Sequence, residues 1–114
     1  NGQQHLCVCE GDYNAGCSYW SANDRASCRL WNDPRFTWLV GNDVDTTTKS
    51  TVCAYDRIVT ADLNAYMLAG TASAFNYQTA YGLNDSLTYD VSDHYPVEVQ
   101  MVVDLSNGER ERLH

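Results

Sequence analysis

The sequence lacks any run of apolar residues long enough to span a membrane, so we expect no membrane-spanning segment. Basic residues are also scarce: seven Lys and Arg stand against fifteen Asp and Glu, for a formal net charge of −8. Because phosphate contacts need Lys and Arg, this balance opposes casual binding to nucleic acid. Phosphate chemistry on such a chain would need divalent cations to offset the acids. There is no long basic run, internal repeat or low-complexity tract.

The chain does have five cysteines in 114 residues, 44% apolar residues and 11% aromatic residues. The length allows one domain or less, and the composition suits a globular protein. Five cysteines in a short acidic chain favour an oxidising compartment, which predicts a secreted, extracellular protein. Asn84-Asp85-Ser86 is a glycosylation sequon, which agrees with secretion although such triplets often arise by chance.

The most informative stretch runs from residue 91 to 99, where Asp93 and His94 stand just before an alternating segment. Apolar and polar side chains alternate from residue 97 to 103, which predicts a strand opened by Pro96. A carboxylate and an imidazole in a loop held by a strand are a common mounting for a reactive pair. A solvated turn with an incidental histidine is the alternative.

Near the N-terminus, residues 5–10 predict a short strand that stops at Gly11. Asp12 and Asn14 follow in a turn-rich segment, two residues apart, and so face the same side of an extended chain. A carboxylate and an amide oxygen on one side can hold a hard cation or orient a phosphate. An Asx turn is the more common use of such residues and stays open as the alternative.

A short helix is expected within residues 18–33, with Asn23 or Asp24 as its N-cap and Pro34 after its end. Three further elements are expected: a strand at 36–40, a turn or helix fragment at 62–70, and a short helix to about residue 90 capped by Asn84 or Asp85. Residues 41–51 form a polar loop whose carboxylates and hydroxyls could ligate Ca²⁺. A solvated loop is an equal alternative, and Lys49 counts against a tight site.

The clearest interior strand runs from Val52 to Thr60, and Asp56 interrupts it. An acid in an apolar strand is costly unless it has a partner. Arg57 points to the opposite face, so a histidine from elsewhere in the fold is the better candidate, because a carboxylate orients and charges an imidazole. A structural, hydrogen-bonded acid is the alternative.

Five segments occur in a characteristic order: residues 11–19, 29–31, 53–59, 75–83 and 92–99. Together, over roughly residues 6–103, they resemble the C-terminal half of the deoxyribonuclease I-like proteins of the endonuclease/exonuclease/phosphatase superfamily. The resemblance assigns residues 1–103 to half of such a domain and leaves residues 104–114 as a charged tail. It implies an α+β fold: half of a four-layer α/β/β/α sandwich, with one mixed sheet and flanking helices.

The resemblance also implies roles, position by position. Asp12 and Asn14 match a pair that orients metal and phosphate, and Asp93 matches an acid of the metal centre for Mg²⁺ or Mn²⁺. Asp56 matches an acid that pairs with a catalytic histidine, and His94 matches one of two catalytic histidines. The chemistry implied is hydrolysis of double-stranded DNA to 5′-phosphate products.

Cys17 and Cys53 match the structural disulfide of the family. Cys7 and Cys9 face the same side of a strand and are poorly placed to bond each other, so they and Cys28 are expected as buried thiols unless one bonds another chain.

Three residues match a structural Ca²⁺ loop: Asp45, Thr47 and Thr51. Lys49 stands where the family tends to have Thr, which weakens that prediction.

The family's domain is about twice as long, and the missing half carries a metal-binding Glu, a Glu that orients the His94 equivalent, and the other catalytic histidine. We therefore expect the active centre to need a second half. A lone half-sandwich would expose a sheet face and strand edges, which predicts association. Either an N-terminal half completes the site, or two copies pack symmetrically so that Asp56 of one meets His94 of the other. The alternative function is a non-catalytic secreted assembly module that forms a homo-oligomer or filament.

Overall fold

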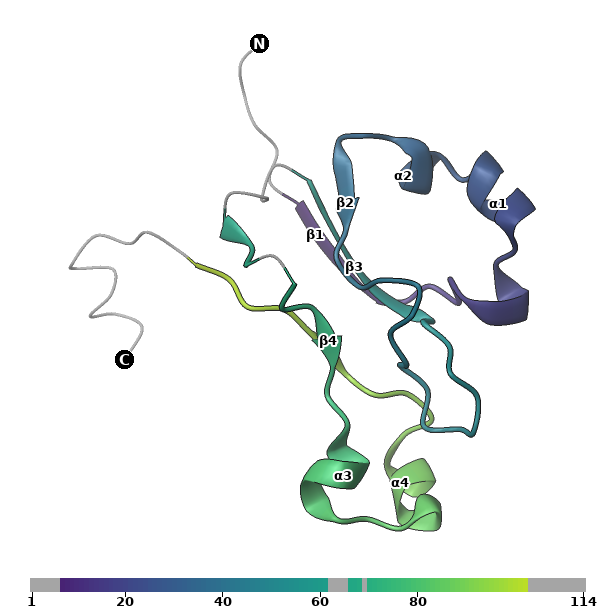
Figure 1. Cartoon of the computed structure of the whole chain (residues 1–114), viewed down its shortest axis with the longest axis vertical. Coiled ribbons are helices and arrows are strands. Elements are labelled where there is room, and N and C mark those ends of the chain that lie inside the picture. Colours follow the sequence, from purple (N-terminus) through teal and green to yellow (C-terminus); the bar gives the residue numbers. More distant parts are fainter. Residues whose placement is uncertain (1–6, 62–65, 69, 103–114) are drawn as a thin grey trace, which may run out of the picture.

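The fold is organised around β3 (Asp56–Ala61), the central strand of a three-stranded antiparallel sheet (Figure 1). β3 pairs on one side with β1 (Cys7–Asp12) and on the other with β2 (Phe36–Trp38). Every residue of β3 is buried, and the β-branched run from Ile58 to Thr60 suits such a central strand. This computed structural model describes residues 7–61, 66–68 and 70–102.

A second, two-stranded sheet joins β4 (Ser73–Ala74) to β5 (Val97–Glu98), again antiparallel. Helices and strands together confirm the predicted α+β class. The expected single mixed sheet is wrong for the described residues, in which all pairings between named strands are antiparallel. The reason is that β1 and β2, which are joined through helices and run parallel to each other, do not pair but flank β3 on opposite sides.

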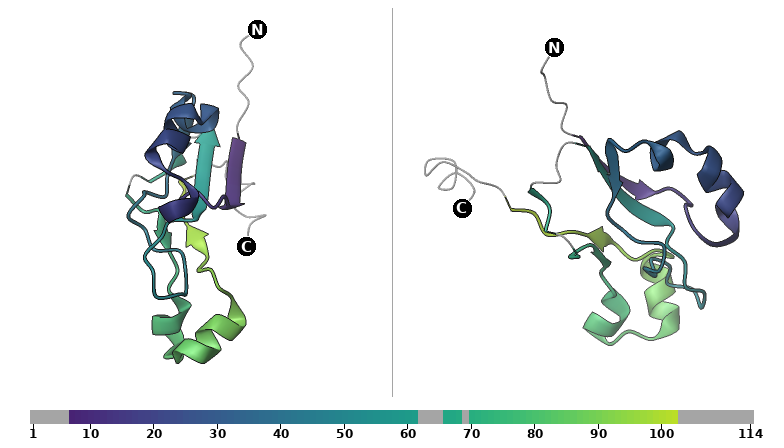
Figure 2. Two further views of the ribbon diagram at one scale, coloured as in Figure 1. Left: turned by 90° about the vertical axis from the view of Figure 1, so that its right-hand side faces the viewer. Right: turned by 45° about the horizontal axis from the view of Figure 1, so that its top comes forward.

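Two short helices, α1 (Ala22–Ser27) and α2 (Arg29–Asn32), connect β1 to β2 and lie on one side of the sheet (Figure 2). Ser21 caps α1: its hydroxyl accepts from the Asp24 amide, and the Asp24 carboxylate accepts from the Ser21 amide. The predicted single helix with a later cap is wrong. This capping box starts α1 earlier, and Cys28, in an extended conformation, separates the two helices.

The opposite end of the molecule carries α3 (Tyr77–Tyr81) and α4 (Asp85–Val91), which pack side by side (Figure 1). The side chain of Asn84 accepts a backbone amide of the first turn of α4, which confirms this predicted cap. Asn76 caps α3 in the same way, and Gly82 ends it in the left-handed region at φ 64°. Within the described ranges, no helix is long and apolar enough to cross a membrane.

Three strands are shorter than their sequence patterns predict, and the first of them, β2, ends at Trp38 rather than at Val40. β3 begins at Asp56 rather than Val52, because the preceding residues are held by the disulfide and by loop hydrogen bonds instead of by the sheet. β5 ends at Glu98, and beyond it a single bridge links Met67 to Met101. Two predicted segments fall largely or wholly outside the described residues: 62–70 and 104–114.

The predicted disulfide between Cys17 and Cys53 is confirmed, with the two Cα atoms 5.6 Å apart. It ties the 3-10 helix η1 (Cys17–Tyr19) to the segment that leads into β3. Gly16 permits this close approach, since a Cβ atom there would lie 2.7 Å from the carbonyl oxygen of Ala54. Closing a loop of this length stabilises the fold by roughly 3–4 kcal/mol in the chain-entropy model.

One side of the sheet packs on three tryptophans, Trp20, Trp31 and Trp38, whose ring centroids lie 5.1–5.3 Å apart. Arg57 is buried against this cluster, with its guanidinium 5.6 Å from the ring centroid of Trp38. The guanidinium donates hydrogen bonds to three backbone carbonyls and one side chain: Ala54, Val40, Ala15 and Asn42. Arg57 therefore points away from Asp56, as the strand alternation predicts.

Candidate functional site

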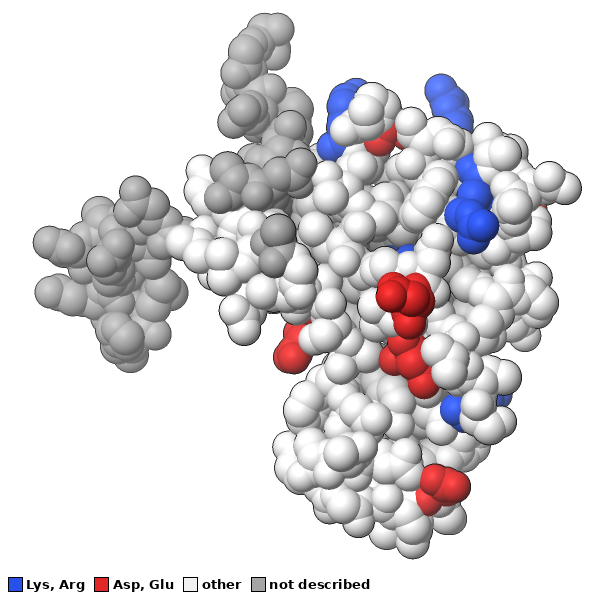
Figure 3. Space-filling view, viewed as in Figure 1, with Lys and Arg blue, Asp and Glu red and all other residues white. Residues whose placement is uncertain are grey.

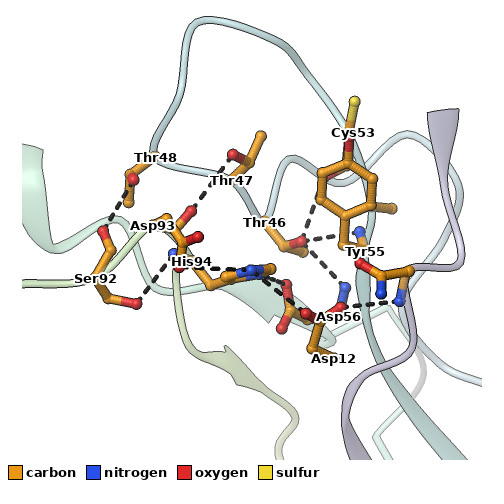
Figure 4. A network of polar contacts seen from close by, with 12 residues as sticks. Asp12, Thr46, Thr47, Thr48, Cys53, Tyr55, Asp56, Ser92, Asp93 and His94 are labelled. Carbon is orange, nitrogen blue, oxygen red and sulfur yellow. Dashed lines mark hydrogen bonds and ion pairs between the residues drawn. The ribbon is translucent and has the colours of Figure 1, made fainter. Parts of the chain in front are cut away.

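An aspartate–histidine pair forms the centre of the site (Figure 4). His94 Nδ1 lies 2.8 Å from Asp56 Oδ2, and the two side chains are only 27% and 11% exposed. Because an ionised carboxylate can only accept a hydrogen bond, Nδ1 carries the proton. The second ring nitrogen, Nε2, lies on the edge of the imidazole that faces away from Asp56. The histidine predicted to partner Asp56 is therefore His94 of the same chain. The contact within one chain does not support the expectation that Asp56 meets the histidine of a second copy. A Glu from further polypeptide that orients His94 stays a prediction.

Two more carboxylates face the free edge of the imidazole. His94 Nε2 lies 3.4 Å from Asp12 Oδ2 and 3.6 Å from Asp93 Oδ1. Burial acts to lower the pKa of His94, but the hydrogen bond with Asp56 and the charges of the three carboxylates outweigh it, so this pKa is raised. The crowded negative charge is offset either by a proton on Nε2 or by a cation held between the carboxylates.

Asp12 reaches this position because it is the last residue of β1, directly opposite Asp56 in the strand register. Its Oδ1 accepts the backbone amide of Asn14 at 2.8 Å, which forms an Asx turn and puts Asn14 in the left-handed region at φ 49°. The Asx-turn alternative is thus confirmed for one carboxylate oxygen. The other oxygen, Oδ2, faces His94.

The loop that carries Asp93 and His94 is fastened to the polar loop that precedes β3 (Figure 4). Thr47 forms an isolated antiparallel bridge with His94, and the Thr48 amide donates to the Asp93 carbonyl at 3.0 Å. The Thr48 hydroxyl donates to the Ser92 carbonyl at 2.9 Å, and the His94 amide donates to the Ser92 hydroxyl at 3.0 Å. The loop is therefore held by contacts remote in sequence, and the alternative of a solvated turn is wrong.

Thr46 connects the segment of Asp56 to the segment of His94, and the sequence analysis did not identify it. It is fully buried, and its hydroxyl accepts the backbone amides of Tyr55 and Asp56 at 3.0 and 3.2 Å. Its carbonyl accepts the Tyr95 amide at 2.8 Å, next to His94. Nothing local distinguishes Thr46 from the hydroxyl residues beside it, because its partners come from β3 and from the loop before β5.

A cavity of about 250 Å³ opens beside His94. Eight residues line it: Asn14, Tyr19, Thr47, Lys49, Thr51, Tyr55, Asp93 and His94. The Tyr55 ring lies 6.3 Å from the imidazole, centroid to centroid. Acidic side chains gather across the middle of the face seen in Figure 3, and the basic ones lie mostly over the region of α1 and α2. The cavity combines a titratable base, hydroxyls and one lysine, a set of groups that can bind and protonate an oxyanion.

Hard-cation ligands are present at the same place. One group of potential ligand atoms is found in the described part of the chain. It takes one atom each from Asp12, Asp56 and His94, and these three atoms lie within 4.8 Å of one another. Because Asp56 is engaged with His94, Asp12 is the acid of this group with an oxygen left for a cation, and its side chain is 40% exposed. Mg²⁺ prefers carboxylate oxygens and keeps several waters, which suits such a half-exposed acid. Asp93, the other predicted metal ligand, is not a member of the group and stays a prediction.

The predicted Ca²⁺ loop is only partly assembled. Asp45 Oδ1 already accepts the amides of Thr47 and Cys53, at 3.2 and 3.4 Å. Asp45 and Thr51 line different cavities, and Lys49 borders both of them. A single carboxylate supplies few of the six to eight oxygen ligands that Ca²⁺ takes. Ca²⁺ binding therefore stays a prediction.

The three free cysteines differ from expectation. Cys7 and Cys28 are half-buried, but Cys9 is exposed, so the prediction of three buried thiols is wrong. Cys7 and Cys9 are both free thiols, in agreement with the expectation that they do not bond each other, and their sulfur atoms lie 3.2 Å apart. Asn84 is exposed, as a glycosylation site requires, and its modification stays a prediction.

The comparisons with known proteins agree with the motif order. The chain is 50% identical to deoxyribonuclease-1 of Homo sapiens over 93 residues, which is 80% of this chain and 33% of that protein. It is 50% identical to the Canis lupus familiaris enzyme over 96 residues and 46% identical to the Bos taurus enzyme over 93 residues. These alignments cover 82% and 80% of this chain, and 34% and 33% of the relatives. No protein-family model matches.

The chain spans about a third of the length of the curated relatives that it matches, a smaller share than the half expected. The predicted resemblance is nevertheless confirmed, because the identity is near 50% and extends over four fifths of the chain. The chain is therefore similar to deoxyribonuclease-1 over about four fifths of its own length and about a third of the length of the relatives.

Proposed function

We propose that this chain supplies one catalytic acid–base pair and part of the metal centre of a divalent-metal-dependent endodeoxyribonuclease that hydrolyses DNA to 5′-phosphate products. The observation that carries the proposal is the contact between Asp56 and His94, with Asp12 and Asp93 at the other edge of the imidazole. The similarity to deoxyribonuclease-1 supports nuclease-type chemistry at the level of the family.

His94 is the proton-transfer group of the proposal. Asp56 fixes the imidazole with its proton on Nδ1, so Nε2 can accept a proton from an attacking water or give one to the leaving 3′-oxygen. Asp56 stabilises the imidazolium that forms when Nε2 accepts a proton. Imidazole is the side chain suited to proton exchange near neutral pH, and the hydrogen bond with Asp56 and the nearby carboxylates raise the pKa of His94.

Asp12 and Asp93 would hold Mg²⁺ or Mn²⁺, which when bound would stabilise the charge that develops on the phosphate. Asn14 borders the same cavity and would position the phosphate through its amide. Thr46 acts as a positioning residue, since its hydrogen bonds connect the segment of Asp56 to the segment of His94.

The remaining parts of the proposal concern what completes this chain. The relatives are about three times the length of the aligned segment, so the second acid–base pair and the rest of the four-layer sandwich would come from further polypeptide or from another copy. Since Asp56 and His94 pair within one chain, a second copy would contribute a second such pair rather than exchange partners. Double-stranded DNA is the proposed substrate. The disulfide supports an oxidising, extracellular compartment.

The test is nicking of supercoiled plasmid by the purified 114-residue chain with Mg²⁺, alone and mixed with the N-terminal two thirds of human deoxyribonuclease-1. We expect metal-dependent nicking in at least the mixture, and a loss of at least about 100-fold in the His94→Ala variant. Asp93→Asn should also lose activity, whereas Asp90→Asn, an exposed acid on α4, should not. Equal nicking by wild type and His94→Ala, or none by a folded mixture, would overturn the proposal in favour of a non-catalytic module.

A further inference from the structure

The two cysteines at the start of β1 are brought together in a way that the proposed function does not use. Cys7 and Cys9 are two residues apart on a strand, so their side chains leave the same face. An extended strand separates such Cα atoms by about 6.6 Å at ~3.3 Å per residue. Their sulfur atoms nevertheless lie 3.2 Å apart. Both side chains are therefore turned toward one another, and Cys9 is exposed to solvent.

We propose that Cys7 and Cys9 form a chelating dithiol site for a soft, thiophilic metal ion. Thiolate sulfur selects soft or borderline ions such as Cu⁺, Zn²⁺ and Cd²⁺ over Mg²⁺ or Ca²⁺. Two sulfurs bound tetrahedrally at about 2.3 Å from one ion lie about 3.8 Å apart. Small side-chain rotations, without any movement of the backbone, take the observed pair to that separation.

A disulfide is the competing fate of the pair, and the strand opposes it. Disulfides need Cα atoms about 4.4–6.8 Å apart, most often 5.5–6 Å, so an extended i, i+2 pair stands at the upper limit. Cys7 and Cys9 are opposite Ala61 and Val59 in the register with β3. Closing the bond would shorten β1 and distort this pairing with the central strand. A metal ion bridges the same two sulfurs and leaves the strand extended.

A metal ion must displace the thiol protons of Cys7 and Cys9 before it can bind them. The hydrogen bond with Cys9, followed by burial and the nearby charge of Cys9, raises the pKa of Cys7. Two adjacent thiolates repel, so both lose their protons together only when a positive ion lies between them. Binding should therefore release protons and become tighter as the pH rises.

The site is separate from the His94 centre in place and in chemistry. Cys7 and Cys9 lie at the start of β1, and Asp12 is its last residue. One strand therefore presents two thiols at one end and a carboxylate at the other. The Tyr13 hydroxyl donates to the Cys9 carbonyl at 3.1 Å, which steadies the backbone of the pair. Hard and soft ions should thus distribute between the two ends of β1.

The experiment is an anaerobic titration with Cd²⁺ of the 114-residue chain with its Cys17–Cys53 disulfide intact and its other three cysteines as free thiols, followed by sulfur-to-metal charge-transfer absorbance. This signal reports thiolate ligands only, so Cd²⁺ bound at carboxylates is silent. We expect saturation at one ion per chain and an affinity at least about 100-fold weaker in Cys7→Ser and in Cys9→Ser, because each loses the chelate. Cys28→Ser, which removes the third free thiol, is the matched control and should bind like wild type. Equal loss in Cys28→Ser, or no thiolate signal in wild type, would overturn the proposal.

A second measurement needs no variant and so does not depend on the serine variants folding. A monosubstituted trivalent arsenical, R–As=O, condenses with two thiols to form two As–S bonds and one water, without any redox change. Peptide mapping of the treated wild-type chain should find one arsenic bridging Cys7 and Cys9 within a single peptide. The chain is handled anaerobically with its Cys17–Cys53 disulfide intact. Cys7 and Cys9 that remain unmodified, or that are recovered as a disulfide, would contradict the proposed site.

Discussion

Asp56 and Arg57 are neighbours on the central strand, both charged and both buried, yet they point to opposite sides of the sheet and have different environments. Arg57 faces the tryptophan cluster, and its guanidinium is satisfied by backbone carbonyls and by Asn42. Asp56 faces the cavity side, where its carboxylate meets His94, a group that changes its charge near neutral pH.

The comparison separates two uses of a buried charge. A group whose hydrogen bonds all go to fixed polar atoms stabilises one structure, and burial only lowers the pKa of Arg57 without offering it a titrating partner. A group whose partner is a partly exposed imidazole beside a cavity can take part in chemistry. Adjacent positions can thus differ in function because strand alternation sends them to different faces.

The largest expected effect is on the Arg57 side. Arg57→Lys should lower the free energy of unfolding by about 3 kcal/mol or more, because lysine cannot supply the planar fork that reaches several carbonyls at once. Urea denaturation monitored by tryptophan fluorescence measures it. Arg35→Lys, an exposed arginine, is the matched control and should stay within about 0.5 kcal/mol of wild type. If both variants changed the free energy of unfolding by a similarly small amount, the buried hydrogen bonds of Arg57 would not be important for stability.

The next effect compares two fully buried threonines. Thr46→Val should cost about 1–3 kcal/mol of unfolding free energy, because the amides of Tyr55 and Asp56 lose their acceptor. Thr60 is equally buried, but its hydroxyl has no hydrogen-bond partner among the residues that the structure describes. Thr60→Val should therefore be neutral or stabilise by about 1 kcal/mol. Thermal and chemical unfolding measure the stability of the two variants. If Thr46→Val were as stable as Thr60→Val, Thr46 would not be a positioning residue.

The Asp56 side is better tested by titration than by stability. Asp56→Asn should lower the pKa of His94, because it removes the nearest charge and leaves only a neutral hydrogen-bond partner, while Asp90→Asn should leave that pKa unchanged. NMR titration of the imidazole in metal-free buffer measures both variants. An unchanged His94 pKa in Asp56→Asn would mean that the contact does not control the histidine.

The same pair predicts how stability depends on pH. Since the pKa of His94 is raised by folding, its contribution to stability is fully present below about pH 6.5, the unfolded value, and is lost as the pH rises through the folded value. Wild type should lose more thermal stability across this window than Asp56→Asn. Parallel curves for the two proteins would contradict the sign of this linkage.

The smallest effect lies at the surface. Arg35 holds the pKa of Asp33 at about 2 through side-chain and backbone hydrogen bonds. Because this pKa is depressed, the stabilising contribution is present above the ordinary value of about 3.9 and is lost as the pH falls toward 2. Asp33→Asn should therefore alter acid unfolding slightly and neutral stability hardly at all. A large change at neutral pH would show that this exposed pair carries more than a surface contact.

Much of the local structure was predictable because its causes are local. The Asx turn at Asp12 and the helix cap at Asn84 depend on side chains that bond to amides two or three residues away. The cap at Ser21 was missed even though its capping box is also local, because Asn23 and Asp24 offered competing caps nearby. The late start of β3 was missed because bonds to Thr46, remote in sequence, hold the preceding residues.

By itself the sequence determined which side chains are available: the aspartates, the histidine and the cysteine pair, along with the order of motifs that relates the chain to deoxyribonuclease I. Only the tertiary structure decided which of them meet. Strand register sets Asp12 opposite Asp56, and the loop bonded to Thr46 and Thr47 brings His94 to both. The physical reason is that a register or a loop contact joins residues tens of positions apart, and its energy belongs to the packed fold rather than to any local pattern.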